Sequence, residues 1–179
     1  MKKGLLLVFA GVLAATALQA QKKQDVQSVK GVNYVNAGIG LGTYGFYGTG
    51  GLPVVASVEH GVSDKVSVGL NLGFVSRKYA YDWKYTYLIV GVRGSYHFNE
   101  LLDIDNDKVD VYGGAAINYE HYKLKYNGAI DEGAYKVSGG EVDLQLHAGV
   151  RYLFGKQVGG FAELGYGISP LQLGLTFRF

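Results

Sequence analysis

Apolar and polar residues alternate along most of the chain after residue 32. In segment 66–77 every second residue up to Phe74 is Val, Leu or Phe, and the residues between them are Ser, Gly and Asn. Strict alternation is typical of β-strands, because successive side chains point to opposite faces of a sheet. The pattern predicts eight strands and no helix, at about 33–44, 52–62, 66–77, 86–98, 109–121, 142–154, 160–168 and 171–179.

The two faces of these strands differ in a way that indicates their surroundings. One face is Val, Leu, Ala and aromatic along its length, and the other is mainly Gly, Ser and Asn with scattered charges. A soluble barrel would need an exterior rich in Lys, Glu and Thr around an apolar interior. The sequence therefore predicts an all-β fold, an eight-stranded antiparallel up-and-down transmembrane β-barrel with its apolar face toward lipid.

The positions of aromatic and polar residues predict where the two ends of this barrel lie. Aromatic residues cluster at both ends of the apolar face and predict two girdles at the membrane boundaries. The outer girdle would contain Tyr44, Phe74, Tyr79 and Tyr166, and the inner one Tyr96, Phe98, Tyr152, Phe154 and Phe177. The predicted outer loops are 45–51, 78–85, 122–141 and 169–170, of which the last is very short. The turn at 99–108 is long for the inner side.

The amino-acid composition agrees with a small barrel and excludes several kinds of functional site. Glycine accounts for 28 of 179 residues, about twice its usual share, which suits the cramped interior of a small barrel. Cysteine is absent, which excludes disulfides, thiol nucleophiles and cysteine-ligated metals. The formal charge of +2 gives no indication of nucleic-acid binding.

The first twenty residues predict an export signal. Lys2 and Lys3 precede an apolar run over 4–18 that is too short to span a membrane as a helix. Cleavage is expected after Ala20, with Ala17 as an alternative. Export by this signal would lead the chain to the cell outer membrane of a Gram-negative envelope. The predicted organisation is a signal peptide at 1–20, a polar periplasmic tail at 21–32 and a barrel at 33–179.

The end of the chain carries a family resemblance. The segments VDVYGGAAINYE and FAELGYGISPLQLGLTFRF resemble the small outer membrane protein β-barrel domain family, the type of outer membrane protein X and the barrel of outer membrane protein A. The resemblance implies a C-terminal assembly signal formed by Leu175, Phe177 and Phe179, which the barrel-assembly machinery reads during biogenesis. It also implies a surrounding of outer-membrane lipid and lipopolysaccharide. Members include structural proteins, adhesins, narrow pores and a few lipid-A enzymes, so the resemblance leaves function open.

Charged and histidine side chains fall on the inward face of the predicted strands. Eight strands enclose a space that side chains just fill, and an unpaired buried charge costs several kcal/mol. We therefore expect a polar network that closes the lumen; a gate or ion path is the alternative. The expected members are Glu59, Arg77, Arg93, His97, Asp110, Glu120, Asp143, His147, Arg151, Glu163 and Arg178.

Two hairpin registers follow if the turns are symmetrical. A turn centred on Gln157 places Arg151 opposite Glu163, and a turn centred between 103 and 104 places His97 opposite Asp110. Each pair would meet inside the barrel, where opposed Cβ atoms lie ~4.5–5.5 Å apart.

No candidate chemistry stands out beyond this network. The four histidines fall on different strands without metal-ligand spacing, and nothing in the spacing of Ser138, His121 and Glu120 supports a catalytic triad. We expect no catalytic residue, cofactor or metal, and no nucleic-acid partner. The predicted function is a non-enzymatic outer-membrane protein that serves envelope structure or surface interaction through loops such as 122–141. A small gated pore for minor solutes is the alternative, and a lipid-A-modifying enzyme is a third.

Overall fold

The computed structural model describes residues 28–43, 49–79, 83–126 and 136–179, with the backbone alone for Tyr79 and Lys136. The predicted signal peptide and Tyr44 lie outside these residues. Within them, no helix is long and apolar enough to cross a membrane. The described strands are β1 (Asn33–Leu41), β2 (Thr49–Gly50), β3 (Val54–Gly61), β4 (Val66–Tyr79), β5 (Trp83–His97), β6 (Val109–Tyr126), β7 (Lys136–Leu153), β8 (Val158–Gly165) and β9 (Leu171–Arg178).

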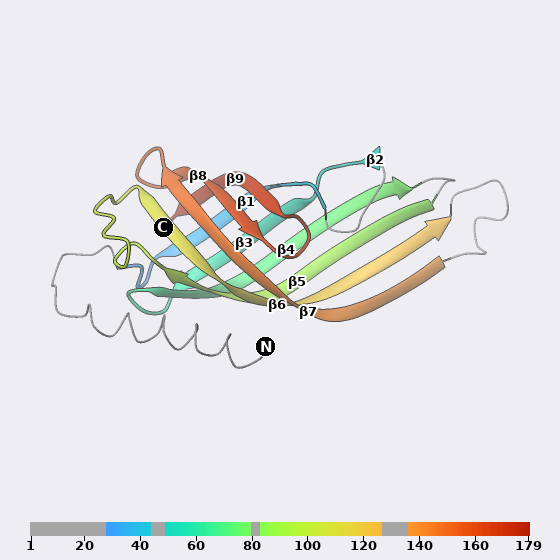
Figure 1. Ribbon diagram of the computed structural model, residues 1–179, viewed down its shortest axis with the longest axis horizontal. Coiled ribbons are helices and arrows are strands. Elements are labelled where there is room, and N and C mark those ends of the chain that lie inside the picture. The colour runs from blue at the N-terminus through green and yellow to red at the C-terminus, as the bar shows by residue number, and fades with distance from the viewer. Residues whose placement is uncertain (1–27, 44–48, 80–82, 127–135) are drawn as a thin grey trace, which may run out of the picture.

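Eight of these strands close into a single barrel (Figure 1). Each pairs antiparallel with its neighbours in the order β4, β3, β1, β9, β8, β7, β6 and β5, and pairing between β4 and β5 completes the ring. Where the first and last barrel strands, β1 and β9, pair, Asn33 and Phe179 exchange backbone hydrogen bonds of 2.9 and 3.0 Å. The predicted eight-stranded antiparallel barrel is confirmed. The two-residue strand β2 was not predicted, and it pairs with the C-terminal end of β4 at Lys78 and Arg77.

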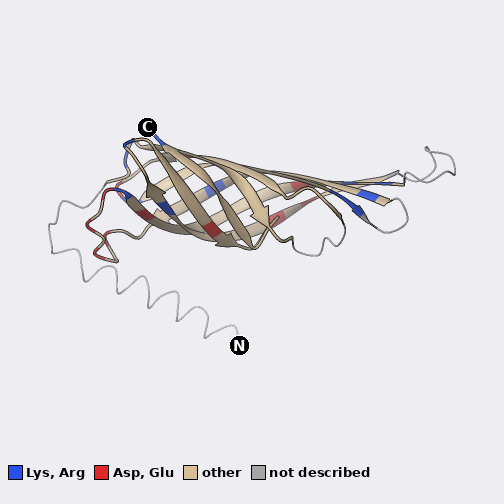
Figure 2. Ribbon diagram, turned by 90° about the horizontal axis from the view of Figure 1, so that it is seen from above, with Lys and Arg blue, Asp and Glu red and all other residues tan. Residues whose placement is uncertain are grey.

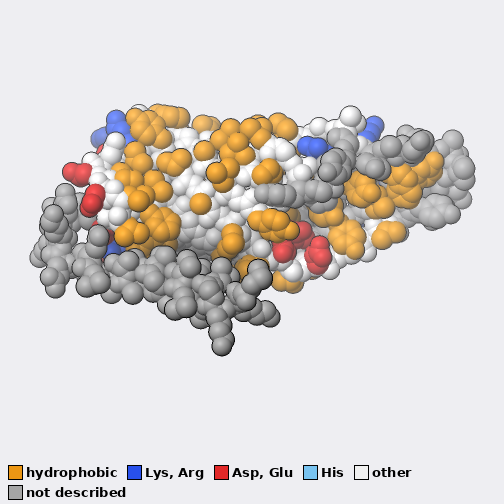
Figure 3. All heavy atoms as spheres, in the orientation of Figure 1, with side chains coloured by type: hydrophobic (Ala, Val, Ile, Leu, Met, Phe, Trp, Pro, Cys, Tyr) orange, Lys and Arg blue, Asp and Glu red, His pale blue; other side chains and the backbone are white. Residues whose placement is uncertain are grey.

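The two faces of the barrel follow the predicted parity. Leu70 on β4 is 57% exposed, whereas the next residue, Asn71, is 9% exposed and points inward. The same alternation runs around the ring and leaves apolar side chains on the outer surface (Figure 3). Inward glycines face backbone or large side chains of the neighbouring strand, so a Cβ at Gly69 would overlap the Val58 carbonyl. Glycine thus lets the narrow lumen hold larger polar groups.

Four strands extend beyond the barrel, further than predicted. Residues 75–79 of β4, 83–88 of β5, 120–126 of β6 and 136–141 of β7 continue their pairing and form a protruding sheet (Figures 1 and 2). The predicted loops 78–85 and 122–141 are therefore wrong, since most of their described residues are strand. Lysines and tyrosines replace the apolar and small residues here, which obscured the alternation in the sequence. The segments 80–82 and 127–135 lie outside the described residues.

The other end of the barrel carries the chain terminus and the turns 62–65, 98–108 and 154–157; we call it the turn end. Its long 98–108 turn agrees with the prediction. Residues 28–32 are fastened there, because Val29 and Gly31 donate backbone hydrogen bonds to Asp64 and Gly61. At the protruding end, β8 and β9 are joined by 166–170, so the predicted connection 169–170 was too short.

Candidate functional site

Arg151 lies at the centre of the lumen and is 1% exposed. Strand β7 directs its guanidinium inward, where Nη1 donates to Asp110 Oδ2 at 2.6 Å and Nη2 donates to Glu59 Oε1 at 2.7 Å. Its Nε donates to Asn36 Oδ1 at 3.2 Å. These contacts join β1, β3, β6 and β7, so one side chain links strands from opposite sides of the barrel.

Two tyrosine rings contact the guanidinium of Arg151 through their faces. The Arg151 Cζ atom lies 3.8 Å from the ring centre of Tyr112 and 4.5 Å from that of Tyr34. Cation–π contacts of this kind are strongest when they are desolvated, as they are here. Gly149, opposite Tyr112, makes room for the phenol, because a Cβ there would lie 2.6 Å from its oxygen. A glycine therefore positions a tyrosine, which in turn positions the arginine.

Glu59 is the main acceptor of the network. Its Oε2 accepts hydrogen bonds from the hydroxyls of Ser67 at 2.9 Å and Ser95 at 2.5 Å. Each serine oxygen also contacts a histidine Nε2 at 2.9 Å, Ser67 that of His97 and Ser95 that of His147. A serine that donates its one hydrogen to Glu59 accepts from the histidine, so each Nε2 is the donor.

His97 connects this chain back to Arg151 through Asp110. Its Nδ1 lies 2.6 Å from Asp110 Oδ1, and a carboxylate can only accept. Ser67, His97 and Asp110 therefore form a continuous chain of polar contacts from Glu59 to Arg151.

Arg93 and Glu163 complete the cluster on the side of β5 and β8. Arg93 Nη2 donates to Glu163 Oε2 at 2.8 Å, and its Nε lies 3.5 Å from Glu59 Oε1. The Tyr112 hydroxyl donates to the same Glu163 oxygen at 3.0 Å. The lumen network comprises Glu59, Arg93, His97, Asp110, His147, Arg151 and Glu163, all buried.

Four of the eleven expected members lie outside this lumen network. Arg77, Glu120 and Asp143 are half-buried toward the protruding end. Arg178 is half-buried at the turn end and donates to the Asp107 carbonyl at 2.8 Å. All four have inward parity, but they stand where the barrel opens, and water can solvate them there.

Both predicted cross-strand registers are wrong by two residues. Arg151 pairs with Phe161, and Glu163 pairs with Gly149, because the turn is centred on Lys156. His97 pairs with Tyr112. A shift of two keeps every side chain on its predicted face, so His97 still reaches Asp110 diagonally. Arg151, however, is bonded to Asp110 and Glu59 in place of Glu163.

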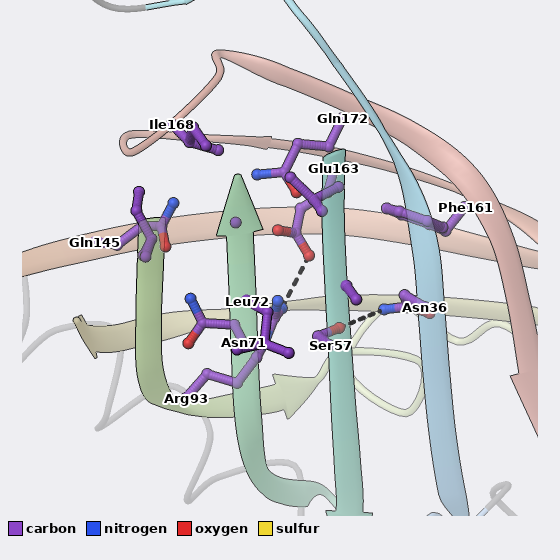
Figure 4. Close-up of a pocket in the computed structure, with 14 residues that line it drawn as sticks. Asn36, Ser57, Asn71, Leu72, Arg93, Gln145, Phe161, Glu163, Ile168 and Gln172 are labelled. Atoms are coloured by element: carbon purple, nitrogen blue, oxygen red, sulfur yellow. Dashed lines mark hydrogen bonds and ion pairs between the residues drawn. The ribbon is translucent and has the colours of Figure 1, made fainter. Parts of the chain in front are cut away.

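An apolar layer, which the sequence reading missed, covers the lumen network on the protruding side. Val55, Val75, Ile89 and Phe161 point inward, and Ile168 of the 166–170 connection packs among them. A cavity of about 20 Å³ lies between this layer and the charges, lined by Asn71, Arg93 and Glu163 among others (Figure 4). It has room for about one water. Inward parity at Val55 and Phe161 was the signal in the sequence that could have predicted this layer.

The protruding sheet has an aromatic inward face. Trp83 lies beside Tyr126, with ring centres 5.1 Å apart, and Tyr87 stacks on Tyr122 at 5.9 Å. Tyr85 occupies the row between them. These side chains continue the lumen parity of β5 and β6 but stand beyond the barrel.

The two edges of the protruding sheet differ. On the β4 side, β2 pairs with Arg77 and Lys78. On the β7 side, β8 pairs only with His147–Leu153, so among the described residues 136–145 have no strand neighbour on that edge. On the same sheet Ser138 and His121 have outward parity, whereas Glu120 has inward parity. The described residues contain no group of His, Asp and Glu that could hold a metal.

The outer membrane protein β-barrel domain family matches residues 6–178. The chain belongs to this family. No curated protein matches it closely enough to count as a relative. The resemblance predicted from the terminal segments is confirmed, and membership places the protein in the outer membrane.

Solved structures show the same fold at low sequence identity. The N-terminal β-barrel domain of Pseudomonas aeruginosa OprF is 14% identical, with a TM-score of 0.55 over 84% of this chain and 98% of that one. Yersinia pestis Ail in a phospholipid nanodisc is 15% identical, with a TM-score of 0.53 over 84% and 100%. Neisserial surface protein A is 14% identical, with a TM-score of 0.52 over 83% and 96%. These likenesses establish the fold alone.

Proposed function

We propose that this protein is a non-enzymatic outer-membrane barrel with a closed lumen that acts through its protruding sheet at the cell surface. The observation that carries the proposal is the contrast between a lumen filled by paired side chains and a sheet in which 136–145 have, among the described residues, no strand neighbour on one edge. In the proposed orientation the turn end faces the periplasm, and residues 1–20 direct export.

Closure of the lumen has two layers. The lumen network spans the barrel with short hydrogen bonds, and the apolar layer around Ile168 covers it. Moving an ion through would require breaking paired, desolvated charges, which costs several kcal/mol each. This argues against the alternative of a small gated pore.

Conductance tests the closed lumen. The purified wild-type barrel in a planar bilayer should show no steady openings. Arg151→Ala, which removes the central cation of the lumen network, should show more openings than wild type. Lys84→Ala in the protruding sheet is the control and should behave like wild type. Steady openings of the wild-type protein would favour the pore.

Surface interaction is supported by the edge of β7 at 136–145, where the described part of the chain places no neighbouring strand. Unpaired backbone groups on a strand edge can accept an extended segment of a partner protein, and the aromatic side chains beside it offer contact area. We infer that the partner contributes such a segment. A displayed library of unstructured peptides, screened against the folded barrel, should yield ligands that slow amide exchange at 136–145. Protection confined to the turn end would refute this mode.

Assembly is proposed to depend on the chain terminus. Phe179 is 61% exposed and Leu175 50%, both on the outward face, with Phe177 half-buried between them. Deleting Phe179 should reduce insertion by the barrel-assembly machinery without changing synthesis. Phe154→Ala, also exposed at the turn end, is the control, and unchanged insertion of the deletion variant would refute the role.

A further inference from the structure

The inward face of the protruding sheet carries carboxylates on the two strands nearest its β7 edge. Glu120 on β6 is paired directly with Glu141 on β7, and Asp143 lies one inward position closer to the barrel. Figure 3 shows acidic side chains gathered on the visible face where this sheet leaves the barrel. Within the part of the chain that the structure describes, no ion pair joins these three carboxylates to a cation. We call Glu141 and Asp143, which both lie on β7, the edge carboxylates.

The electrostatic surroundings of Glu120 reflect this crowding. Partial burial raises the pKa of its carboxyl, and Asp143 and Glu141 raise it further. Burial, Glu120 and Glu141 in turn raise the pKa of the Tyr87 hydroxyl, which places an aromatic side chain near the same charges. Like charges placed directly opposite each other destabilise a sheet. A cation supplied by a partner would remove this repulsion.

Tyr122 extends the aromatic part of this face toward the β7 edge. It is paired with Gly139, and a Cβ at Gly139 would overlap its phenol. Because glycine has no side chain there, the Tyr122 ring reaches across β7. The inward positions of β7 therefore present, in order toward the barrel, a tyrosine ring and then the two edge carboxylates. A cationic side chain is favourable beside all three, by contact with the ring or by pairing with a carboxylate.

The backbone of β7 determines which side chains of an added strand would meet this face. Tyr166 donates a backbone hydrogen bond of 2.9 Å to the Leu146 carbonyl, so the polar groups of Leu146 point toward the β8 side. Because this direction alternates along a strand, those of Val142 and Leu144 point to the same side, where the described residues place no strand. A segment added antiparallel there would face the edge carboxylates in non-hydrogen-bonded pairs, in which side chains lie closest.

A second copy of the same edge is a poor partner. Antiparallel pairing centred on Val142 would place Glu141 opposite Asp143, so that carboxylate would meet carboxylate. The segment that fits is instead basic at its inward positions. Its outward residues would lie beside Val142 and Leu144, which are 71% and 59% exposed, and should therefore be apolar.

We propose that the β7 edge selects extended peptide segments with basic residues at three alternate positions and apolar residues between them. Two of the basic residues pair with the edge carboxylates, and the third lies beside the Tyr122 ring. In strand addition, backbone hydrogen bonds give affinity and alternate side chains give specificity. The inference rests on the proposed binding of an extended segment at this edge and adds the chemistry of that segment.

Two peptides of identical composition test the pattern. KVKVKV has its lysines at alternate positions, whereas KKVVVK has no two lysines that are two residues apart. Full-length protein folded in neutral detergent is titrated with each fluorescently labelled peptide, and binding is measured by anisotropy. KVKVKV should bind about fivefold or more tightly than KKVVVK, because only its lysines can face both edge carboxylates. Equal affinities would overturn the proposal.

Variants of equal charge test the residues. E141Q/D143N should weaken binding of KVKVKV about fivefold or more. The control D103N/D105N removes two exposed carboxylates from the turn 98–108 and should bind KVKVKV like wild type. Equal losses in both variants would overturn the proposal, since net charge alone would then suffice.

Exchanging the charges provides a test by gain of binding. E141K/D143K should bind the acidic peptide EVEVEV more tightly than wild type does and should lose affinity for KVKVKV. Because a gain is expected, this result does not depend on the stability of E141Q/D143N. Unchanged preference for KVKVKV would refute the role of the edge carboxylates.

Amide exchange separates this inference from the proposed function. KVKVKV should slow exchange at 136–145. Equal protection by KVKVKV, KKVVVK and EVEVEV would leave the peptide-binding edge in place and overturn its basic specificity. Absence of protection by all three would overturn both. Spermine that competes fully with KVKVKV, together with no protection at 136–145, would show a site for soluble cations and overturn the strand-adding mode.

Discussion

The barrel and the protruding sheet share four strands, yet the chemistry of their two faces is reversed. On β5 the barrel part has Val90 and Val92 outward and Arg93 inward, whereas the protruding part has Lys84 outward and Trp83 inward. Inside the membrane the outward face must be apolar. Beyond it both faces meet water, and the sheet gathers its large side chains on one of them. The alternation of residues determines which side chains share a face of the sheet. The surroundings, lipid or water, determine which of the two faces is apolar.

The two regions also differ in how completely their polar groups are paired. Every strand of the barrel has two neighbours, and the lumen network joins its charges. In the protruding sheet, the part of the chain that the structure describes gives residues 136–145 of β7 a strand neighbour on one side only. We therefore expect the barrel to contribute most of the stability, whereas recognition by the sheet stays a proposal.

Arg151→Met should have the largest effect on the barrel. Glu59 and Asp110 would lose their shared cation, and breaking a buried ion pair costs ~3–5 kcal/mol. Urea unfolding in detergent micelles measures the loss. Lys84→Met in the protruding sheet should change stability by less than ~0.5 kcal/mol. Similar losses in both variants would erase the distinction between the regions.

Ile168→Ala should destabilise by ~2–3 kcal/mol, because the side chain is buried in the apolar layer and its removal leaves a cavity. The lumen network should still prevent steady conductance in a planar bilayer. The exposed Leu102→Ala in the turn 98–108 is the control and should cost well under half as much. Conductance by Ile168→Ala would show that the apolar layer alone closes the barrel.

Gly149→Ala tests how the lumen network is positioned. The added Cβ would press on the Tyr112 phenol, which stacks on Arg151, so we expect a loss of ~1–3 kcal/mol. Gly155 has open space around its Cβ direction, and Gly155→Ala should be close to neutral. Equal unfolding midpoints for the two variants would mean that the tyrosine adjusts freely.

Hydrogen exchange should show the edge directly. Amides of 136–145, with a strand on one side only, should exchange about tenfold or more faster than those of His147–Leu153, which lie between β6 and β8. Mass spectrometry of peptides from the folded protein gives both rates in one experiment. Uniform protection along β7 would contradict an open edge.

Glu100→Gln should have the smallest effect. Glu100 lies 2.7 Å from Lys65 at the exposed turn end, and its hydrogen bond raises the pKa of Lys65. The contribution is present at neutral pH and lost as the pH rises through the pKa of Lys65. Screening by solvent limits it to under ~0.5 kcal/mol. A larger loss would show that stability is not concentrated in the lumen network.

The alternation predicted a large part of this structure. Eight strands, their antiparallel order, the lipid-facing side and the inward parity of Glu59, Arg93 and Arg151 are all readable from residue order. Because side-chain direction repeats every two residues, even registers wrong by two kept these residues on the correct face.

The pairing inside the lumen could not be read in the same way. Arg151 binds Glu59 and Asp110, which are 92 and 41 residues away, because closure of the ring and the actual registers bring them together. Tyr112 joins them because Gly149 happens to lie opposite it. Such contacts depend on positions in three dimensions that no local pattern encodes.

The sequence by itself determined which side of each strand faces lipid, since burial of an apolar face depends only on residue type and a period of two. Only the tertiary structure decided where the strands leave the membrane and which charges pair. Those features depend on register and on strand length beyond the barrel, and both are set by neighbouring strands.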